Sequence, residues 1–462
     1  MREILGATVW DMQARIIESV RDNKRTAVRS CHGIGKSFLA SHVALWFLNA
    51  HPNSIVATTA PTFRQVEKIL WQEIGKAVAL APAPLGGKVL NTEIKIAPGW
   101  YAFGFSSDDP TSAQGIHAEH VLIIYDEASG LTDELCEALE GALTSGHCRL
   151  LSIGNPTSPT SWFAREFKTP GTERFAVSAL DTPNFTEFGI TLEDLTSGEW
   201  ERKVNGAKMP APWLITPEWT ADKVKRWGVE SPAFKSRVLA EFPDAGDDTL
   251  IPLSWIEAAQ QRTIELDAKV KHPDELAVDV ARFGGDETVI GRRRGVIERG
   301  SIYRVHGAHR GFDTMQTAGA VARAMVETGA TVAKIDANGV GGGVFDRLKE
   351  QGKWKVAALN AGEAAHDPER FVNARAEWFW NLRGLFEQGL VDIDPNDDDL
   401  LGQLSALKFK VDSRGRILIE SKQDMRKRGM PSPDRADTMA MAYATSSKSA
   451  SAFVDAMRRV RA

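Results

Sequence analysis

The sequence predicts an α/β protein with two principal domains. Residues 25–180 alternate short apolar runs with helical patterns, which is typical of a three-layer domain with a mainly parallel sheet. The second half differs, because there short strands carry isolated acidic residues. A length of 462 residues also exceeds what one hydrophobic core usually serves, so we expect at least two domains.

Composition is that of a globular protein and excludes several classes. Apolar residues make up 43% of the chain and charged residues 25%. The formal net charge is −5, so any nucleic-acid surface must be local. The three cysteines show no metal-ligand spacing and are too few for a disulfide framework. We see no signal peptide and no apolar stretch long enough to cross a bilayer, and we therefore expect a protein of the reducing cytoplasm.

The first strand and helix are joined by a glycine-containing segment, SCHGIGKS, at residues 30–37. Such a loop directs several backbone N–H groups toward one point and adds the positive end of a helix dipole, which suits phosphate. The segment matches the pattern G-x-x-x-x-G-K-S/T except that Ser30 stands in the first position. The alternative is a glycine-rich turn that opens an ordinary helix.

Four residues of this segment are the candidate nucleotide contacts besides Ser30. Gly33 and Gly35 shape the loop, Lys36 would reach the β- and γ-phosphates, and Ser37 would ligate Mg²⁺. This interpretation makes ATP with Mg²⁺ the expected ligand of the first domain.

A second apolar run, residues 120–125, ends in two acidic residues, Asp126 and Glu127. A continuous apolar run is typical of a strand buried on both faces of a parallel sheet, and ligands bind at the carboxyl ends of such strands. Asp126 would hold Mg²⁺, and Glu127 would polarise the attacking water. Two acids in a solvated turn are the alternative, but the upstream phosphate loop favours a paired ATPase site.

Two amide side chains complete the predicted nucleotide site. Gln13 lies in a helical pattern just before the first strand, where it could bind the adenine edge or simply face solvent. Asn155 follows the buried run at residues 150–153, and we expect it to sense the γ-phosphate. A common Asn-Pro turn is the alternative for Asn155.

The chain is predicted to divide into four parts. Residues 1–185 form the nucleotide-binding domain, and residues 186–250, which are helical and polar with scattered Trp and Pro, form a lid or linker. Residues 251–450 form the second domain, and residues 451–462 form a C-terminal tail.

Acidic residues recur at the ends of elements in the second domain. Asp279 lies inside a short apolar strand, Asp336 ends another, and Asp434 and Asp437 are three residues apart at the start of a helix. An ionisable group inside an apolar strand is costly unless it is paired or bound to metal. A spacing of three residues places Asp434 and Asp437 on one face of the helix.

If these acids converge, a divalent cation would resolve their repulsion. Two carboxylates 4 Å apart repel by ~4 kcal/mol at an effective dielectric near 20. Carboxylate oxygens without His or Cys suit Mg²⁺ or Mn²⁺, and two such ions ~4 Å apart can promote hydrolysis of a phosphodiester. Any one of these acids could have a purely structural role. Together, the set predicts a metal-dependent nuclease.

A hairpin pattern at residues 406–420 leads to four basic residues, Lys422, Arg426, Lys427 and Arg428. Beside a metal cluster, such residues would hold DNA phosphates without reading bases. The alternative is a solvated charged face.

These motifs together resemble the large terminase subunit of tailed bacteriophages and prophages. The matching segments follow the family's order over almost the whole chain: residues 30–37, 60–62, 115–120 leading into 126–129, 152–156, 239–252, 279–284 and 432–437. The resemblance implies an ASCE-type P-loop ATPase domain joined to a ribonuclease-H-like nuclease domain. It implies a viral DNA-packaging motor that translocates double-stranded DNA into a procapsid and cleaves concatemeric DNA.

The resemblance also implies roles for single residues. Lys36, Ser37 and Asp126 would bind phosphate and metal, Glu127 would be the base, and Asn155 would couple hydrolysis to movement. Asp279, Asp336 and Asp434 would hold one or two Mg²⁺ or Mn²⁺ ions, with Asp437 and Asp286 nearby. The resemblance does not distinguish Asp434 from Asp437 as the direct ligand. Many relatives carry an Arg inside the phosphate loop, where this chain has His32.

Partners and location follow from the same resemblance. We expect sequence-tolerant contact with double-stranded DNA, a small terminase subunit, a portal protein on the procapsid and a homo-oligomeric ring when docked. The place of action would be the cytoplasm of the bacterial host, with no membrane and no place in the mature virion. One alternative is a helicase or repair ATPase that binds DNA without cutting, and another is a capsid-docking scaffold without ATP turnover.

Overall fold

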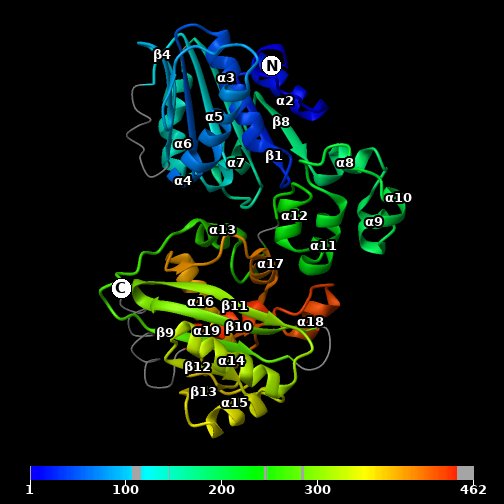
Figure 1. The fold of residues 1–462 in the computed structure, drawn as a ribbon, viewed down its shortest axis with the longest axis vertical. Helices are drawn as coiled ribbons and strands as arrows, with labels where there is room; N and C mark the ends of the chain where they lie inside the picture. The colour runs from blue at the N-terminus through cyan, green and yellow to red at the C-terminus, as the bar shows by residue number, and fades with distance from the viewer. Residues whose placement is uncertain are drawn as a thin grey trace. The chain divides into compact units, whose positions relative to one another are not determined.

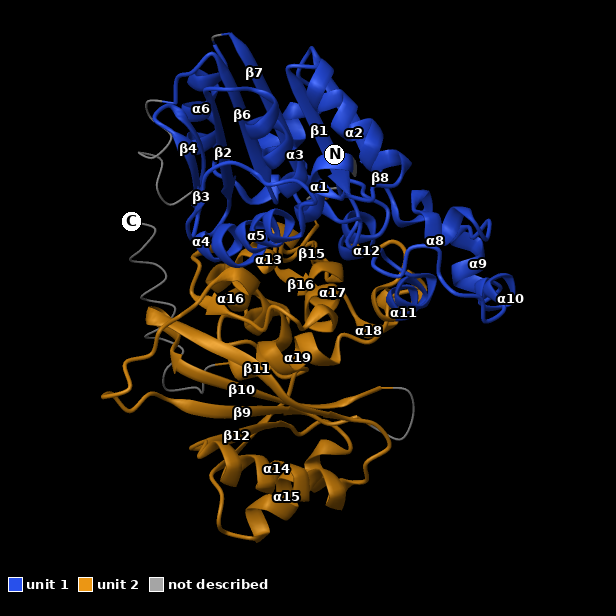
Figure 2. Ribbon diagram, turned by 45° about the horizontal axis from the view of Figure 1, so that its top comes forward, with its two compact units in different colours: residues 1–225, 232–244 blue, residues 226–231, 245–462 orange. Residues whose placement is uncertain are grey.

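A computed structural model describes residues 2–106, 116–144, 146–243, 246, 248–281 and 286–444. The chain forms two compact units, coloured separately in Figure 2. Unit 1 contains residues 1–225 and 232–244, and unit 2 contains residues 226–231 and 245–462. Among the described residues, no helix is long and apolar enough to cross a membrane.

Unit 1 is built on an eight-stranded sheet in the order β3-β4-β5-β2-β6-β7-β1-β8. Six strands are parallel and form the body of the sheet: β1 (Arg25–Ser30), β2 (Ser54–Ala60), β5 (Trp100–Ser106), β6 (His120–Asp126), β7 (His147–Gly154) and β8 (Thr172–Val177). At one edge, β3 (Lys88–Val89) and β4 (Glu93–Ala97) run antiparallel. The mainly parallel sheet confirms the predicted fold class of the first domain.

The helices of unit 1 complete its layers (Figure 1). The longest, α3 (Lys36–Ala50), follows β1 and packs against β2, β6 and α5. Its residues are apolar on nearly every face, as expected for a helix that is buried between the sheet and other helices. Leu39, Val43 and Phe47 are fully buried. The other helices before residue 180 are α1 (Arg2–Leu5), α2 (Asp11–Asp22), α4 (Phe63–Gln65), a π-helical turn (Val66–Leu70), α5 (Trp71–Leu80), α6 (Asp133–Glu140) and α7 (Trp162–Glu166).

The chain after β8 is helical, as the lid or linker pattern suggests. Its helices are α8 (Pro183–Thr186), α9 (Leu192–Ser197), α10 (Trp200–Val204), α11 (Pro217–Trp227) and α12 (Pro232–Arg237). The boundaries of the four predicted parts stay predictions, and the predicted tail at residues 451–462 lies outside the described residues.

Unit 2 contains a six-stranded mixed sheet in the order β13-β12-β9-β10-β11-β14. The strands are β9 (Asp274–Asp279), β10 (Thr288–Val296), β11 (Gly300–His309), β12 (Val332–Asp336), β13 (Val356–Leu359) and β14 (Val391–Asp392). The first three are antiparallel neighbours, and β12 and β13 continue the sheet in parallel beside β9.

Helices lie on both faces of this sheet (Figure 2). On one side are α14 (Thr314–Thr328) and α15 (Gly341–Glu350), which close an apolar core around Val278, Ile335 and Val344. On the other side, α19 (Asp434–Ala442) packs on β9 and β10. The remaining elements are α13 (Leu253–Gln261), α16 (Ala374–Glu387), α17 (Asp398–Ala406), α18 (Lys422–Lys427) and the predicted hairpin, β15 (Phe409–Val411) with β16 (Ile417–Ile419).

Candidate functional site

The phosphate loop joins β1 to α3 in unit 1. Gly33 and Gly35 adopt left-handed backbone conformations, with φ of +67° and +81°, which glycine reaches without strain. A Cβ atom on Gly35 would lie 2.9 Å from the side-chain nitrogen of Gln13. Because α3 begins at Lys36, its unpaired N–H groups and positive dipole end point into the loop.

The predicted residues of the loop meet those of the two central strands. Lys36 Nζ donates a hydrogen bond of 3.0 Å to Asn155 Oδ1 and lies 3.6 Å from Glu127 Oε1. Ser37 Oγ donates a hydrogen bond of 3.2 Å to Asp126 Oδ2. Residues 119 positions apart in the chain therefore converge at the carboxyl ends of β6 and β7.

The two acids after β6 differ in environment. Burial raises the pKa of Asp126 to about 7, and the adjacent charge of Glu127 adds to this effect, while Lys36 and Ser37 oppose it. Glu127 is partly exposed and has a φ of +49°. A non-glycine residue in this conformation stores strain, and such residues concentrate at functional sites. Asp126 is thus a carboxylate short of positive charge, and Glu127 follows it in a strained backbone conformation.

Gln13 and Ser30, two further predicted nucleotide contacts, lie at the base of the loop. Gln13 is buried, and its side-chain nitrogen donates to the carbonyl of Ile34 at 3.0 Å. Ser30 is the last residue of β1, and its hydroxyl has no hydrogen-bond partner among the described residues. The carbonyl of Ser30 accepts a bond of 2.6 Å from Asn155 Nδ2. Asn155 therefore bridges Lys36 and the end of β1.

The predicted acidic residues of unit 2 also converge. Asp279 ends β9 and Asp336 ends β12, and these parallel neighbours finish at the same edge of the sheet. Asp434 and Asp437 lie in the first turn of α19. The ammonium group of Lys422 lies among three of them, 3.5 Å from Asp279, 3.1 Å from Asp434 and 3.1 Å from Asp437. We call these four acids and Lys422 the acidic site.

Electrostatics of the acidic site reflect an excess of negative charge. Burial raises the pKa of Asp279, and the charges of Asp437, Asp434 and Asp336 raise it further, against the effect of Lys422. Burial also raises the pKa of Asp336. Burial lowers the pKa of Lys422, but the surrounding carboxylates outweigh it and the net shift is upward. Four carboxylates, three of them within 3.5 Å of one ammonium group, are a donor set that fits hard divalent cations.

Neighbouring groups fix the two acids of α19. Asp434 Oδ2 accepts a hydrogen bond of 3.0 Å from the backbone N–H of Glu287, and Asp434 Oδ1 accepts one of 2.5 Å from Ser432 Oγ. Asp437 Oδ1 accepts a bond of 3.0 Å from Arg375 Nε. Both carboxylate oxygens of Asp434 are therefore held by hydrogen bonds, whereas Asp437 shares its charge with Arg375.

Three further residues near the acidic site differ from what the sequence predicts or lie beside residues that are not described. Asp286 pairs with Arg426 at 3.3 Å, and residues 282–285 of the matching segment lie outside the described residues, as does Gly115. Lys422 was expected to hold DNA phosphates, yet it lies inside the acidic site. Arg375 was not anticipated. Its only signal in the sequence is a basic residue at the start of an amphipathic helix, which is too common to identify a site.

Known proteins similar to this chain include large terminase subunits. No family model matches the chain. The chain is 27% identical over 469 residues to the probable terminase large subunit of Enterobacteria phage P7, covering 95% of this chain and 88% of that protein. Among solved structures, the large terminase of bacteriophage HK97 is 15% identical, with a TM-score of 0.37 and 95% of each chain covered. The nuclease domain of the large terminase subunit of bacterial virus Sf6 is 22% identical, with a TM-score of 0.38, and covers 43% of this chain and 100% of that domain. The chain is thus similar along almost its entire length to a protein described as a probable large terminase subunit.

Proposed function

We propose that the chain is the motor subunit of a viral DNA-packaging machine. It hydrolyses ATP to translocate double-stranded DNA into a procapsid, and it cleaves concatemeric DNA with a metal-dependent endonuclease. The observation that carries this proposal is the presence of two separate sites in one chain. One is a phosphate loop linked to Asp126 and Asn155, and the other gathers Asp279, Asp336, Asp434 and Asp437.

In the ATPase, the loop N–H groups and Lys36 bind the phosphates of ATP. Ser37 and Asp126 are the residues that hold Mg²⁺, which neutralises charge on the phosphates. Glu127 accepts a proton from the attacking water. Gln13 supports the loop through Ile34, and Gly33 and Gly35 allow the backbone to approach the nucleotide.

The hydrogen bonds of Lys36 suggest how nucleotide binding reaches the sheet. Lys36 contacts Asn155 and lies near Glu127, so turning its ammonium group toward phosphate releases both side chains. Asn155 also binds the carbonyl of Ser30 at the end of β1. Asn155 therefore changes partners when phosphate arrives, and this is the coupling role that we assign to it.

In the nuclease, Asp279, Asp336 and Asp434 hold Mg²⁺ or Mn²⁺, with two ions expected and Asp437 beside them. Bound ions would activate water and stabilise the leaving oxygen of a phosphodiester. Asp434 is oriented by Ser432 and by the N–H of Glu287. Lys422 compensates the carboxylates and must give up part of that role when cations bind.

DNA contact in this proposal is made through phosphates, and it is sequence-tolerant and sensitive to salt. Arg426 and Lys427, which are 58% and 77% exposed, are the basic residues of α18 that point to solvent. A small terminase subunit would select the site, and a portal protein would dock a ring of these chains on the procapsid. The motor would act in the cytoplasm of the host bacterium.

The test is to measure ATP turnover and plasmid cleavage in one preparation of the full chain. We expect DNA-stimulated ATP hydrolysis with Mg²⁺ and nicking of supercoiled plasmid with Mn²⁺. ATP turnover without nicking would favour the helicase or repair ATPase. The absence of turnover even with DNA and procapsid would favour the scaffold. The convergence of four carboxylates favours the cutting enzyme over both.

A further inference from the structure

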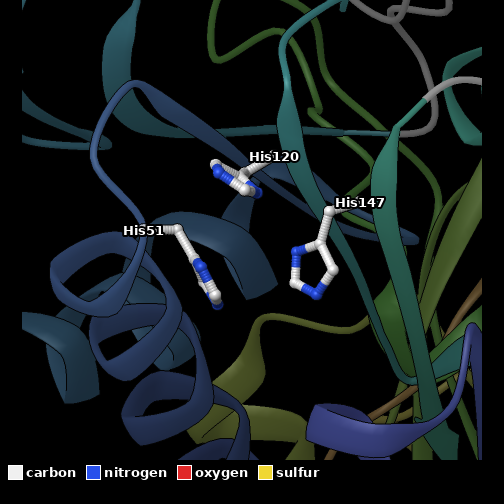
Figure 3. A group of neighbouring side chains, drawn as sticks. All are labelled: His51, His120 and His147. Atoms are coloured by element: carbon white, nitrogen blue, oxygen red, sulfur yellow. The ribbon is translucent and has the colours of Figure 1, made fainter.

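Three histidines gather at the edge of the unit 1 sheet that is opposite the phosphate loop (Figure 3). His51 directly follows α3, His120 begins β6 and His147 begins β7. His120 and His147 are register partners on adjacent parallel strands. One ring nitrogen from each of the three lies within 4.8 Å of the others. Figure 3 shows the three rings turned toward a common centre.

We propose that His51, His120 and His147 form a binding site for a Zn²⁺ ion. Zinc is commonly bound by three imidazoles, and tetrahedral geometry with Zn–N distances of ~2.0–2.1 Å puts the nitrogens ~3.4 Å apart. Side-chain rotations close the remaining distance, because the three ring centroids already lie 4.7–5.2 Å apart. The imidazole donor set favours zinc over magnesium, which prefers oxygen.

Hydrogen bonding supplies a second observation. The Nδ1 atoms of His120 and His147 are buried and have no hydrogen-bond partner among the described residues. Buried polar atoms are nearly always satisfied in native proteins, so each unpaired nitrogen calls for a partner beyond the described residues. Coordination of a cation would satisfy one or both of these nitrogens.

The surroundings fix the rings in place. Phe47 on α3 stacks on His147 with ring planes 3° apart and centroids 5.7 Å apart. The carboxylate of Glu119 lies 3.9 Å from His120 Nε2, the ring nitrogen opposite the buried Nδ1. The charge of Arg149 acts on His51 and His147, and its guanidinium donates to the carbonyl of Arg21.

The location indicates a structural role. Helix α3 starts at Lys36 in the phosphate loop and ends one residue before His51, so its 15 residues separate the two sites by ~22 Å. A metal ion here would tie the carboxyl end of α3 to the first residues of β6 and β7. It would brace the helix that carries the phosphate loop without contacting the nucleotide. The inference is independent of the proposed packaging function.

The test is Zn²⁺ binding by the full chain without an affinity tag. Chelator-treated protein is kept in excess Mg²⁺, which occupies the oxygen sites, and is titrated with Zn²⁺ against a chromophoric competitor. We expect one tight equivalent and, with Co²⁺ as substitute, the intense visible absorption of four-coordinate cobalt. Even outer-shell partners of metal sites are worth about 10- to 100-fold in affinity, so His51→Gln or His147→Gln should weaken binding by at least about 100-fold.

The matched control is His272→Gln, which removes an exposed imidazole from unit 2 and should leave the affinity unchanged. Circular dichroism checks that each variant folds. X-ray absorption of the zinc-loaded wild type needs no variant, and we expect scattering from three imidazoles. No tight equivalent in excess Mg²⁺, or zinc surrounded by oxygen alone, would overturn the proposal and leave the cluster as ring packing only.

Discussion

The ammonium group of Lys422 lies 3.1 Å from a carboxylate oxygen of Asp434. The same group reaches Asp437 and Asp279, so one lysine compensates the acidic site in the absence of metal. Lysine is suited to this task because its compact charge sits on a flexible stem and can move when a cation enters. Because Lys422 contacts the same carboxylates that would bind metal, the stability of unit 2 depends on the charges of the acidic site.

Replacing this lysine should therefore destabilise the metal-free chain. Breaking a buried ion pair costs about 3–5 kcal/mol, and since the side chain of Lys422 is 39% exposed we expect about 1–3 kcal/mol for Lys422→Met. Thermal unfolding in chelator measures the loss, and Mn²⁺ should restore much of it. Lys427→Met, which removes a surface pair with Asp424, is the control and should change stability by less than about 0.5 kcal/mol. A Lys422→Met protein as stable as wild type in chelator would contradict this.

The metal-free chain should lose stability as pH rises from about 4 to about 8. The pKa of Asp279 is raised to about 8 by burial and by the neighbouring acids, whereas an unfolded Asp titrates near 3.9. Between these values the folded chain holds a proton that the unfolded chain has lost, so stability falls with rising pH. Asp126 acts in the same direction in unit 1.

Chemical denaturation in chelator at pH 5 and pH 8 measures this effect. Asp279→Asn should reduce the fall in stability, and Asp279→Asn combined with Asp126→Asn should reduce it further. If the wild-type chain became more stable from pH 5 to pH 8, the carboxyl groups of Asp279 and Asp126 would not dominate the pH dependence of its stability.

Glu127→Gln should abolish ATP hydrolysis while nucleotide binding persists. The phosphate contacts of Lys36 and the loop remain, but the amide cannot accept a proton, and general bases contribute about 10²- to 10⁴-fold. ATP turnover measures the loss of hydrolysis, and binding of a fluorescent ATP analogue measures whether the nucleotide is still bound. Glu137→Gln on the exposed face of α6 is the matched control and should keep full turnover. Turnover by the Glu127→Gln protein at the wild-type rate would require another base.

Gly341→Ala should impair the nuclease through the backbone of Asp336. A Cβ atom at this position would lie 1.7 Å from the carbonyl oxygen of Asp336, so the strand end must move. Overpacking of this kind costs about 1–3 kcal/mol. Gly343→Ala is the control, because its nearest neighbour is a Thr314 methyl group at 3.6 Å. Plasmid cleavage should fall only in Gly341→Ala, with ATP turnover unchanged in both, and equal cleavage by the two variants would refute the role of this close approach.

The sequence predicted most of the framework because its signals are local. Continuous apolar runs such as residues 120–125 belong to strands covered on both faces, and the loop before Lys36 has a recognisable pattern. Asp279 and Asp336 stood out because acids are rare inside apolar strands, and parallel pairing of their strands brought them to one edge.

Contacts between distant segments could not be predicted in the same way. Lys422 is separated from Asp279 by more than a hundred residues, and nothing local distinguishes it from the exposed Lys427. The three histidines lie far apart in the chain at strand and helix ends, without any ligand spacing that marks a metal site. Gln13 had a suitable position for adenine, but only the structure reveals that its amide holds the loop carbonyl of Ile34.

The central claim is that the acids of unit 2 form one metal-dependent cutting site, and a metal titration tests it most directly. Plasmid nicking by the wild type is measured against Mg²⁺ and Mn²⁺ beside Asp279→Asn, Asp336→Asn and Asp434→Asn, with Asp346→Asn, at an exposed position of α15, as the control outside the cluster. We predict that metal activates the wild type and the control, and that each of the three variants loses nicking while keeping ATP turnover. Nicking by Asp279→Asn at the wild-type rate, or no metal dependence in the wild type, would contradict the account.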